Sequence, residues 1–354
     1  MVRSARYLLI GLLVPLGWTD TARSNISEAA VLFLQIPMDV RGRGMGDVGV
    51  ALPDIAFAID VNPALLAETE YASAGYAWGD WLPTLPDDLK IKAAHGTIGT
   101  KILWNRLSVG FGYKRLNLGE QIRTDASGNV LGTFGTWEWA ATFGAAVRIT
   151  PNVAFGASIK RIESHLSDQG AGQERGSGEA DGWALDWGVY FGGLLPQATF
   201  KGTRAEPKPV PRPWYDWSKT TQDGFGVGFA VRNTGNDISY IDANQADPLP
   251  QAWSLGFSYR PINTFDVGLL LVGEVKTDMV GTDHQSTYGW GAELSLFRFV
   301  DLRIGHVDDR DGDISALTWG VGLGIPLFQI NYAMMAQESK PLDGTLIISF
   351  TSRW

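Results

Sequence analysis

The sequence predicts an all-β fold, a transmembrane antiparallel β-barrel of about 14 strands with an N-terminal plug segment, and three observations lead to it. Segments in which large apolar residues alternate with small or polar ones recur from residue 70 to the end of the chain. After the N-terminal leader there is no uncharged apolar run of about 18 residues, the length that a spanning helix needs. The chain also ends on an aromatic residue, Trp354, as expected for the closing strand of an outer-membrane barrel.

The N-terminus has the features of a secretory signal peptide. Arg3 and Arg6 form a basic start, and residues 7–16 form an apolar run too short for a spanning helix of about 20 residues. The Ala22–Ser24 tripeptide places small residues at cleavage spacing, so residues 1–24 are expected to be removed. An uncleaved anchor is the alternative, and the short apolar run argues against it.

Composition excludes several classes of function. The chain has 354 residues, of which 45% are hydrophobic and 19% charged, with a net charge of -9 and no cysteine. A nucleic-acid partner is not expected, because phosphate binding needs a basic face. The absence of cysteine excludes disulfides and thiolate metal ligands, and we predict no cofactor.

The alternating segments have one large apolar face and one face of small residues. In residues 317–325, Leu, Trp, Val, Leu and Ile alternate with Thr and three glycines. A glycine-rich face would make a poor water-facing surface of a soluble β-sandwich, the alternative fold, but it suits a crowded barrel interior. We expect strands near residues 70–79, 90–99, 105–117, 133–148, 151–165, 181–194, 223–233, 251–261, 264–276, 286–297, 299–308, 314–325, 327–337 and 344–354.

The links between these strands alternate in length, as long outer loops and short periplasmic turns should. Long polar links are expected at 117–132, 167–181 and 233–251. Tight links are expected at Thr150-Pro151, 261–263, Arg298 and Pro326. An even strand number then places both ends of the barrel in the periplasm.

One expected periplasmic link, residues 195–223, is long and proline-rich. It carries Trp214, Tyr215 and Trp217 after a basic stretch. It is either a semi-rigid spacer without a role or a docking segment for a periplasmic partner, with the three aromatic residues as anchors. The sequence leaves both interpretations open.

Residues 25–69 precede the first expected strand and do not alternate. The glycine-rich run over 42–49 lacks the Lys-Ser/Thr ending of a phosphate-binding loop, whereas its glycines would let backbone approach backbone inside a barrel. We therefore expect a signal peptide over 1–24, a plug over 25–69 and a barrel over 70–354. The residues expected to pack the plug are Gly44, Met45, Gly46, Gly49, Asn62 and Pro63.

The last expected strand carries Phe350 and Trp354 on its apolar side. This strand would close the barrel against the first one, and an open edge in lipid leaves backbone groups unpaired. We predict that both aromatic residues are needed for barrel closure and assembly.

The sequence resembles the PorV/PorQ family of outer-membrane barrels. The resemblance rests on RGRGMGDVGVALPD followed by DVNPALLA, and on LDWGVY, GVGFAVRNTGNDISYID and PLPQAWSLGFSYRP in the same order. It implies a fold similar to the FadL fatty-acid transporter, with fourteen strands and an N-terminal plug. The proline-rich link is a departure, because the family does not usually carry it at that turn.

No catalytic constellation is visible. His95, His165, His284 and His306 lack partners at metal-ligand spacing. The acidic run over 308–313 resembles half of a calcium loop but lacks the closing Glu, so a solvated outer turn is preferred over a weak calcium site. We expect no enzyme activity.

Three functions are weighed. The family resemblance implies a non-catalytic binding and shuttle role in type IX protein secretion, with secretion machinery and secreted cargo as partners. The alternative is a FadL-like passive transporter of hydrophobic small molecules. An outer-membrane enzyme is the third class and the least favoured. In each case the chain would contact outer-membrane lipid in a Gram-negative-type bacterium.

Overall fold

A computed structural model of the chain describes most of the region after the expected signal peptide. Residues 1–28, the segment with Trp214, Tyr215 and Trp217, and the terminal Trp354 lie outside the described residues. The residues described are 29–53, 56–68, 72–81, 91–102, 107–125, 127–150, 152–167, 178–194, 224–240, 246–281, 286–309, 314–325, 327–336 and 343–353.

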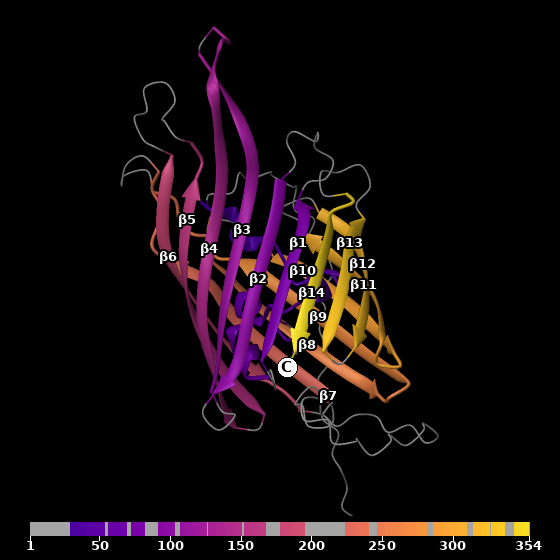
Figure 1. Cartoon of the computed structure of the whole chain (residues 1–354). Helices are drawn as coiled ribbons and strands as arrows, with labels where there is room; N and C mark the ends of the chain where they lie inside the picture. Colours follow the sequence, from indigo (N-terminus) through magenta and orange to yellow (C-terminus); the bar gives the residue numbers. More distant parts are fainter. Residues whose placement is uncertain are drawn as a thin grey trace, which may run out of the picture.

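Fourteen antiparallel strands form a closed barrel, in which each strand pairs with its sequence neighbours and β1 pairs with β14 (Figure 1). The expected all-β barrel is confirmed. The strands are β1 Ser73–Trp81, β2 Ile91–Ile102, β3 Leu107–Thr124, β4 Val130–Thr150, β5 Val153–His165, β6 Glu179–Phe191, β7 Gly224–Gly235, β8 Ala252–Asn263, β9 Val267–Asp278, β10 Ser286–Leu296, β11 Val300–Asp309, β12 Ile314–Ile325, β13 Phe328–Ala336 and β14 Leu346–Arg353.

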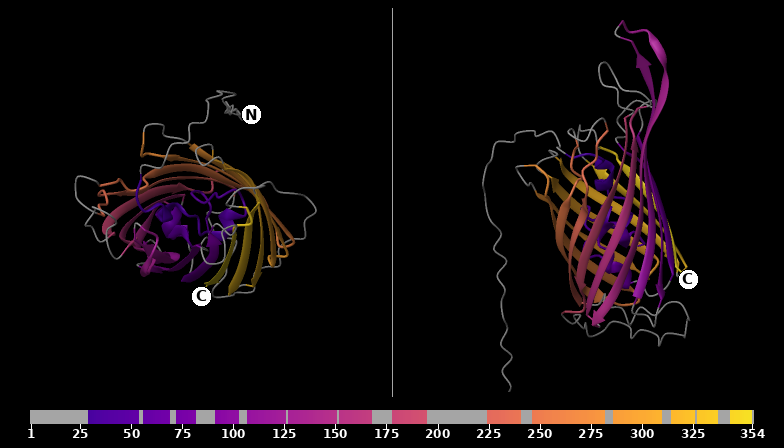
Figure 2. Two further views of the ribbon diagram at one scale, coloured as in Figure 1. Left: turned by 90° about the horizontal axis from the view of Figure 1, so that it is seen from above. Right: turned by 90° about the vertical axis from the view of Figure 1, so that its left-hand side faces the viewer.

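The two ends of the barrel differ in their connections. At one end β1 begins, β14 ends, and β4–β5, β8–β9, β10–β11 and β12–β13 are joined by two or three residues; we call this the turn end. At the opposite end, the loop end, the β3–β4 hairpin projects beyond its neighbours (Figures 1 and 2). Because outer-membrane barrels have short periplasmic turns and longer outer loops, we infer that the loop end faces outward.

The projecting hairpin corrects one expectation. Residues 117–132 were expected to form a polar link, but β3 and β4 continue through most of this segment and pair with each other, for example Ile122 with Thr133. The segment is mostly polar, but antiparallel strands pair through their backbone N–H and C=O groups, so a polar segment can extend a hairpin. Only residues 125–129 form the turn, where the Asp125 carboxylate accepts hydrogen bonds from the N–H groups of Ser127 and Asn129, each at 2.8 Å.

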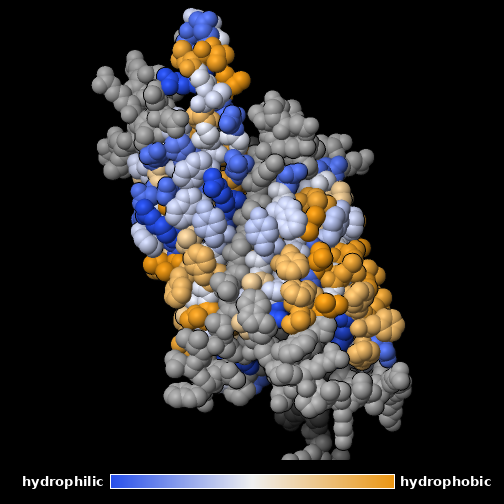
Figure 3. Space-filling model, in the orientation of Figure 1, coloured by the Kyte–Doolittle hydropathy of each residue, from blue (hydrophilic) through white to orange (hydrophobic). Residues whose placement is uncertain are grey.

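Side chains alternate strictly between the two faces of the wall. In β6, Trp183, Leu185 and Trp187 are 50%, 55% and 41% exposed, whereas the intervening Ala184 and Asp186 are 1% exposed. On the face that Figure 3 shows, apolar side chains gather over the lower part of the described wall, below more hydrophilic ones. Because the sheet closes on itself, it has no edge strand whose backbone N–H and C=O groups would remain unpaired in lipid.

The closing strand β14 carries Phe350 on this outer face. Phe350 lies opposite Tyr76 of β1 and Ile330 of β13, and its ring stacks on that of Phe328 with centroids 5.5 Å apart. That Phe350 is needed for barrel assembly remains a prediction.

The segment before β1, described over residues 29–53 and 56–68, lies inside the barrel (Figure 2). We call it the lumen segment. It contains the short helices η1 Leu32–Gln35, α1 Val40–Arg43, α2 Ala58–Val61 and η2 Pro63–Glu68. Among the described residues, no helix is long and apolar enough to cross a membrane. The segment starts at the loop end, where Ala30 N–H donates to the Pro248 carbonyl at 2.9 Å. It reaches the turn end, where Glu68 pairs with Arg148 of β4 at 3.0 Å.

Candidate functional site: the lumen segment and the cavity beside it

The middle of the lumen segment rests with its backbone against glycines of the wall. A Cβ atom added at Gly289 of β10 would collide with the carbonyl oxygen of Gly46, and one at Gly305 of β11 would collide with the backbone of Met45. Gly46 itself has a backbone φ of +88°, a conformation that residues with a side chain rarely adopt. The glycines on the inner face of the wall therefore permit a backbone-to-backbone fit that larger residues would prevent.

The expected plug residues lie at this contact. Gly44 lies against the backbone of Gly320, and Met45 is fully buried. The Gly46 N–H donates to Thr318 Oγ1 at 2.8 Å. Their necessity for plugging remains a prediction.

The remaining expected plug residues hold the next stretch of the segment. Gly49 N–H donates to Glu274 Oε2 at 2.6 Å, and Asn62 Nδ2 donates to the Val50 carbonyl at 2.8 Å. Asn62 Oδ1 also accepts from the N–H of Ala64 at 3.1 Å, which fixes the start of η2. Pro63, the first residue of η2, lies against Gly156 of β5.

A buried charged network holds α1 to the wall. Arg41 donates two hydrogen bonds to Glu293 of β10, at 2.7 and 2.8 Å. Arg303 of β11 donates to the same carboxylate at 2.7 Å and also pairs with Asp301 at 3.0 Å. Glu293 and Arg303 are only 3% and 4% exposed, so each charge depends on its partner rather than on water.

Helix α1 begins with a buried acidic cap. The Asp39 carboxylate accepts hydrogen bonds from the N–H groups of Arg41 and Gly42, at 3.2 and 3.1 Å. Burial raises the pKa of Asp39 to about 6, although Arg41 and these N–H groups act to lower it. Burial also raises the pKa of Asp47, against the lowering effect of Arg43.

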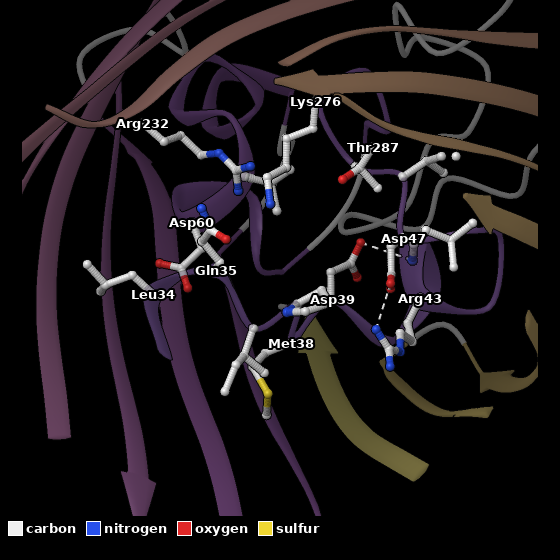
Figure 4. Close-up of a pocket in the computed structure, with 18 of the residues that line it drawn as sticks. Leu34, Gln35, Met38, Asp39, Arg43, Asp47, Asp60, Arg232, Lys276 and Thr287 are labelled. Atoms are coloured by element: carbon white, nitrogen blue, oxygen red, sulfur yellow. Dashed lines mark hydrogen bonds and ion pairs between the residues drawn. The ribbon is translucent and has the colours of Figure 1, made fainter. Parts of the chain in front are cut away.

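Beside the lumen segment, toward the loop end, lies a partly open cavity of about 570 Å³ (Figure 4). One side is formed by the lumen segment, with the apolar side chains of Phe33, Leu34 and Met38 among its lining. The other side is formed by wall residues near the ends of strands, including Arg232 of β7 and Thr287 of β10. The cavity therefore combines an apolar surface with charged groups.

Most charged groups of the cavity wall are engaged within the protein. Lys114 donates to the carbonyls of Leu34 and Ile36, at 3.3 and 2.9 Å, and lies 3.5 Å from the Asp60 carboxylate. Arg43 pairs with Asp47 at 2.6 Å.

Five charged residues of this site were not predicted from the sequence: Arg41, Glu293, Arg303, Arg232 and Lys276. A signal was available for the four that lie in strands, which are all except Arg41. Each of the four falls on the small, inward face of an expected strand, where a charge inside a membrane protein indicates an internal partner or a pathway.

His165 and His306 are not among the residues that line the cavity. His165 stacks on Trp137 with centroids 5.2 Å apart and pairs with Glu179 at 3.1 Å, and His306 lies 4.8 Å from the ring of Trp290. Within the described residues, no group of three or more acidic or His side chains could hold a metal ion. Most of the acidic run over 308–313 lies outside the described residues.

The fold defines the class of protein: a fourteen-stranded β-barrel of the outer membrane of a Gram-negative-type bacterium. No known family model and no curated protein sequence matches the chain.

Solved structures do match. The Ralstonia pickettii toluene transporter TbuX is 15% identical, with 90% of this chain and 98% of that chain covered and a TM-score of 0.55. The Pseudomonas putida toluene transporter TodX is 12% identical, with 88% and 97% covered and a TM-score of 0.54. The monoaromatic hydrocarbon channel CymD is 13% identical, with 90% and 97% covered and a TM-score of 0.53.

These neighbours are FadL-family outer-membrane barrels, and at such low identity the likeness shows the fold alone. The expected FadL-like fold is thus confirmed. The narrower resemblance to PorV/PorQ barrels remains a prediction from the sequence motifs.

Proposed function

We propose that the chain is a passive transporter of hydrophobic small molecules across the outer membrane. The observation that carries this proposal is the cavity of about 570 Å³ between the lumen segment and the wall, large enough for a small ligand and partly apolar. Two structural neighbours, a toluene transporter and a monoaromatic hydrocarbon channel, point the same way.

The lumen segment fits this role better than that of an open aqueous pore. It touches the wall from Ala30 at the loop end to Glu68 at the turn end, and its middle rests on wall glycines. A transporter of this kind should conduct ions poorly while it still passes apolar molecules.

The test is uptake of radiolabelled toluene by cells that express the protein or its variants. Thr287→Trp places a large side chain in the cavity and should lower the uptake rate about tenfold or more. Tyr288→Trp is the matched control, because Tyr288 is the next residue of β10 and faces outward, 44% exposed. Unchanged uptake in Thr287→Trp, with a folded barrel, would refute the cavity as the route.

The shuttle role in type IX secretion is kept as a second candidate, because of the projecting β3–β4 hairpin. Its apolar side chains Ile122, Val130 and Leu131 are 67%, 68% and 56% exposed near the tip, which suits contact with another protein. Replacing residues 119–134 by a tight turn should leave the barrel folded and abolish co-purification of secretion machinery and cargo. Retained co-purification would remove this support.

The docking role of Trp214, Tyr215 and Trp217 also remains a prediction. Replacing Trp214 and Trp217 by Ala should leave barrel folding intact and weaken association with a periplasmic partner, measured by co-purification.

A further inference from the structure

The charges around the cavity are not balanced. Seven acidic and four basic side chains belong to the described residues that line it. Three of the acidic groups are held by neutral donors: Glu274 accepts from the N–H groups of Gly49 and Val50, Asp278 from Gln35, and Glu138 from Ser164. The lining is therefore acidic as a whole, and a simple organic anion would be repelled from most of it.

Two basic side chains lie close together in one corner of the cavity. Arg232 of β7 and Lys276 of β9 project into it, near enough for each charge to act on the other (Figure 4). Lys276 also feels the charges of Asp278, Asp309 and Glu274, and Asp278, at 3.9 Å, lies beyond hydrogen-bond distance. The Arg232 Nε atom is buried and has no hydrogen-bond partner among the described residues.

A second buried atom without a partner lies on the lumen segment. Asp47 uses one carboxylate oxygen to bind Arg43, whereas its Oδ1 atom is buried and accepts no hydrogen bond from the described residues. Buried polar atoms are nearly always hydrogen-bonded, because leaving them unpaired costs free energy. The lining of the cavity therefore includes a donor atom, Arg232 Nε, and an acceptor atom, Asp47 Oδ1, that a ligand could pair.

An apolar surface is available to the same ligand. Leu34 and Met38 lie along the lumen segment on the cavity side (Figure 4). A neutral hydrocarbon would cover this surface but would leave Arg232 Nε and Asp47 Oδ1 unpaired. A ligand with polar groups of opposite charge and an apolar body would satisfy all three features.

We propose that this cavity binds a small amphipathic zwitterion. Its carboxylate faces Arg232 and Lys276, its ammonium group faces Asp47, and its hydrocarbon body lies against Leu34 and Met38. The inference goes beyond the proposed transport of hydrophobic molecules, because it gives the cavity a ligand with two charged ends, and it rests on that function only for the passage of the ligand across the membrane.

The test measures binding to the full-length protein in detergent by isothermal titration calorimetry. The probes are ω-aminooctanoate, octanoate and octylammonium, which share the chain length and differ in their charged ends. We expect ω-aminooctanoate to bind at least about tenfold more tightly than either of the others. Equal affinity for octanoate and ω-aminooctanoate would overturn the proposal, as would the absence of binding by all three, which would leave water as the partner of both atoms.

Two variants separate the two ends of the ligand. Arg232→Gln should weaken binding of ω-aminooctanoate about tenfold and leave that of octylammonium unchanged. Asp47→Asn should weaken binding of ω-aminooctanoate and octylammonium and leave that of octanoate unchanged. Arg123→Gln, in the hairpin outside the cavity, is the control and should change none of them. If both cavity variants weaken all three probes alike, a general loss of structure explains the result and the proposal fails.

Toluene uptake distinguishes this inference from the proposed function. The expected probe pattern without any uptake would refute transport and leave the zwitterion site standing. Uptake with no preference for ω-aminooctanoate would refute the zwitterion site and leave transport standing.

Discussion

Two parts of the lumen segment meet the barrel wall in opposite ways. Around Met45 and Gly46 the segment is pressed backbone to backbone against wall glycines, and a buried charged network holds the adjoining helix. Around Leu34 and Met38 the same segment meets the wall through side chains instead and borders a cavity with unpaired polar atoms. We call the first region the seat and the second the cavity. We infer that the seat fixes the segment in place, so that the cavity keeps its shape without a ligand.

Breaking the charged network of the seat should have the largest effect on stability. Glu293→Ala leaves Arg41 and Arg303 buried without their shared carboxylate, which typically costs about 3–5 kcal/mol. The free energy of unfolding, measured by urea titration of the refolded protein in detergent, should fall by that amount. Asp181→Ala is the control, because its pair with Arg161 is exposed and is expected to contribute less than about 1 kcal/mol. Equal losses in the two variants would mean that the network does not hold the seat.

The buried cap of α1 should make stability depend on pH. The pKa of Asp39 is about 6 in the folded protein and near 3.8 in the unfolded chain, so the folded state holds a proton that the unfolded state has lost between these values. The free energy of unfolding should therefore fall as pH rises from about 4 to about 6, by on the order of 2–3 kcal/mol. Asp39→Asn keeps the cap but cannot ionise, and it should remove this part of the pH dependence. Identical pH profiles for the variant and the parent protein would contradict the raised pKa.

Enlarging one glycine of the seat should have a smaller but clear effect. Gly289→Val forces the backbone of Gly46 away from β10 and should destabilise the protein by about 1–3 kcal/mol, seen as a lower urea midpoint. Gly135→Val is the matched control, since Gly135 also lies in a strand but a Cβ there would meet open space. If both variants have the same midpoint, wall glycines are not required by the lumen segment.

The sequence predicted the wall well because the wall follows a period of two. Along most strands the outward residues are large and apolar and the inward residues are small or polar, and the expected strand over 314–325 has the bounds that the structure shows. The hairpin extension of β3 and β4 was missed because it lies beyond the lipid and its polar residues obscure the alternation.

The seat and the cavity could be predicted only in part. The glycine-rich run indicated a close fit, but the wall glycines that receive it lie more than 200 residues away. Arg41 meets Glu293 across 252 positions, and only the three-dimensional register brings them together. The unpaired atoms of Arg232 and Asp47 are a property of the finished packing, and no local pattern reveals them.

The seat and the cavity can be compared most directly by thiol labelling, because the chain contains no native cysteine. Single variants Met45→Cys in the seat, Thr287→Cys in the cavity and Thr133→Cys in the hairpin would be exposed, in intact cells, to a small membrane-impermeant thiol reagent. Met45 is fully buried, so its variant should remain unlabelled while the cavity and hairpin variants react. Labelling of Met45→Cys as fast as Thr133→Cys would contradict the account, because the lumen segment would then not be seated in the barrel.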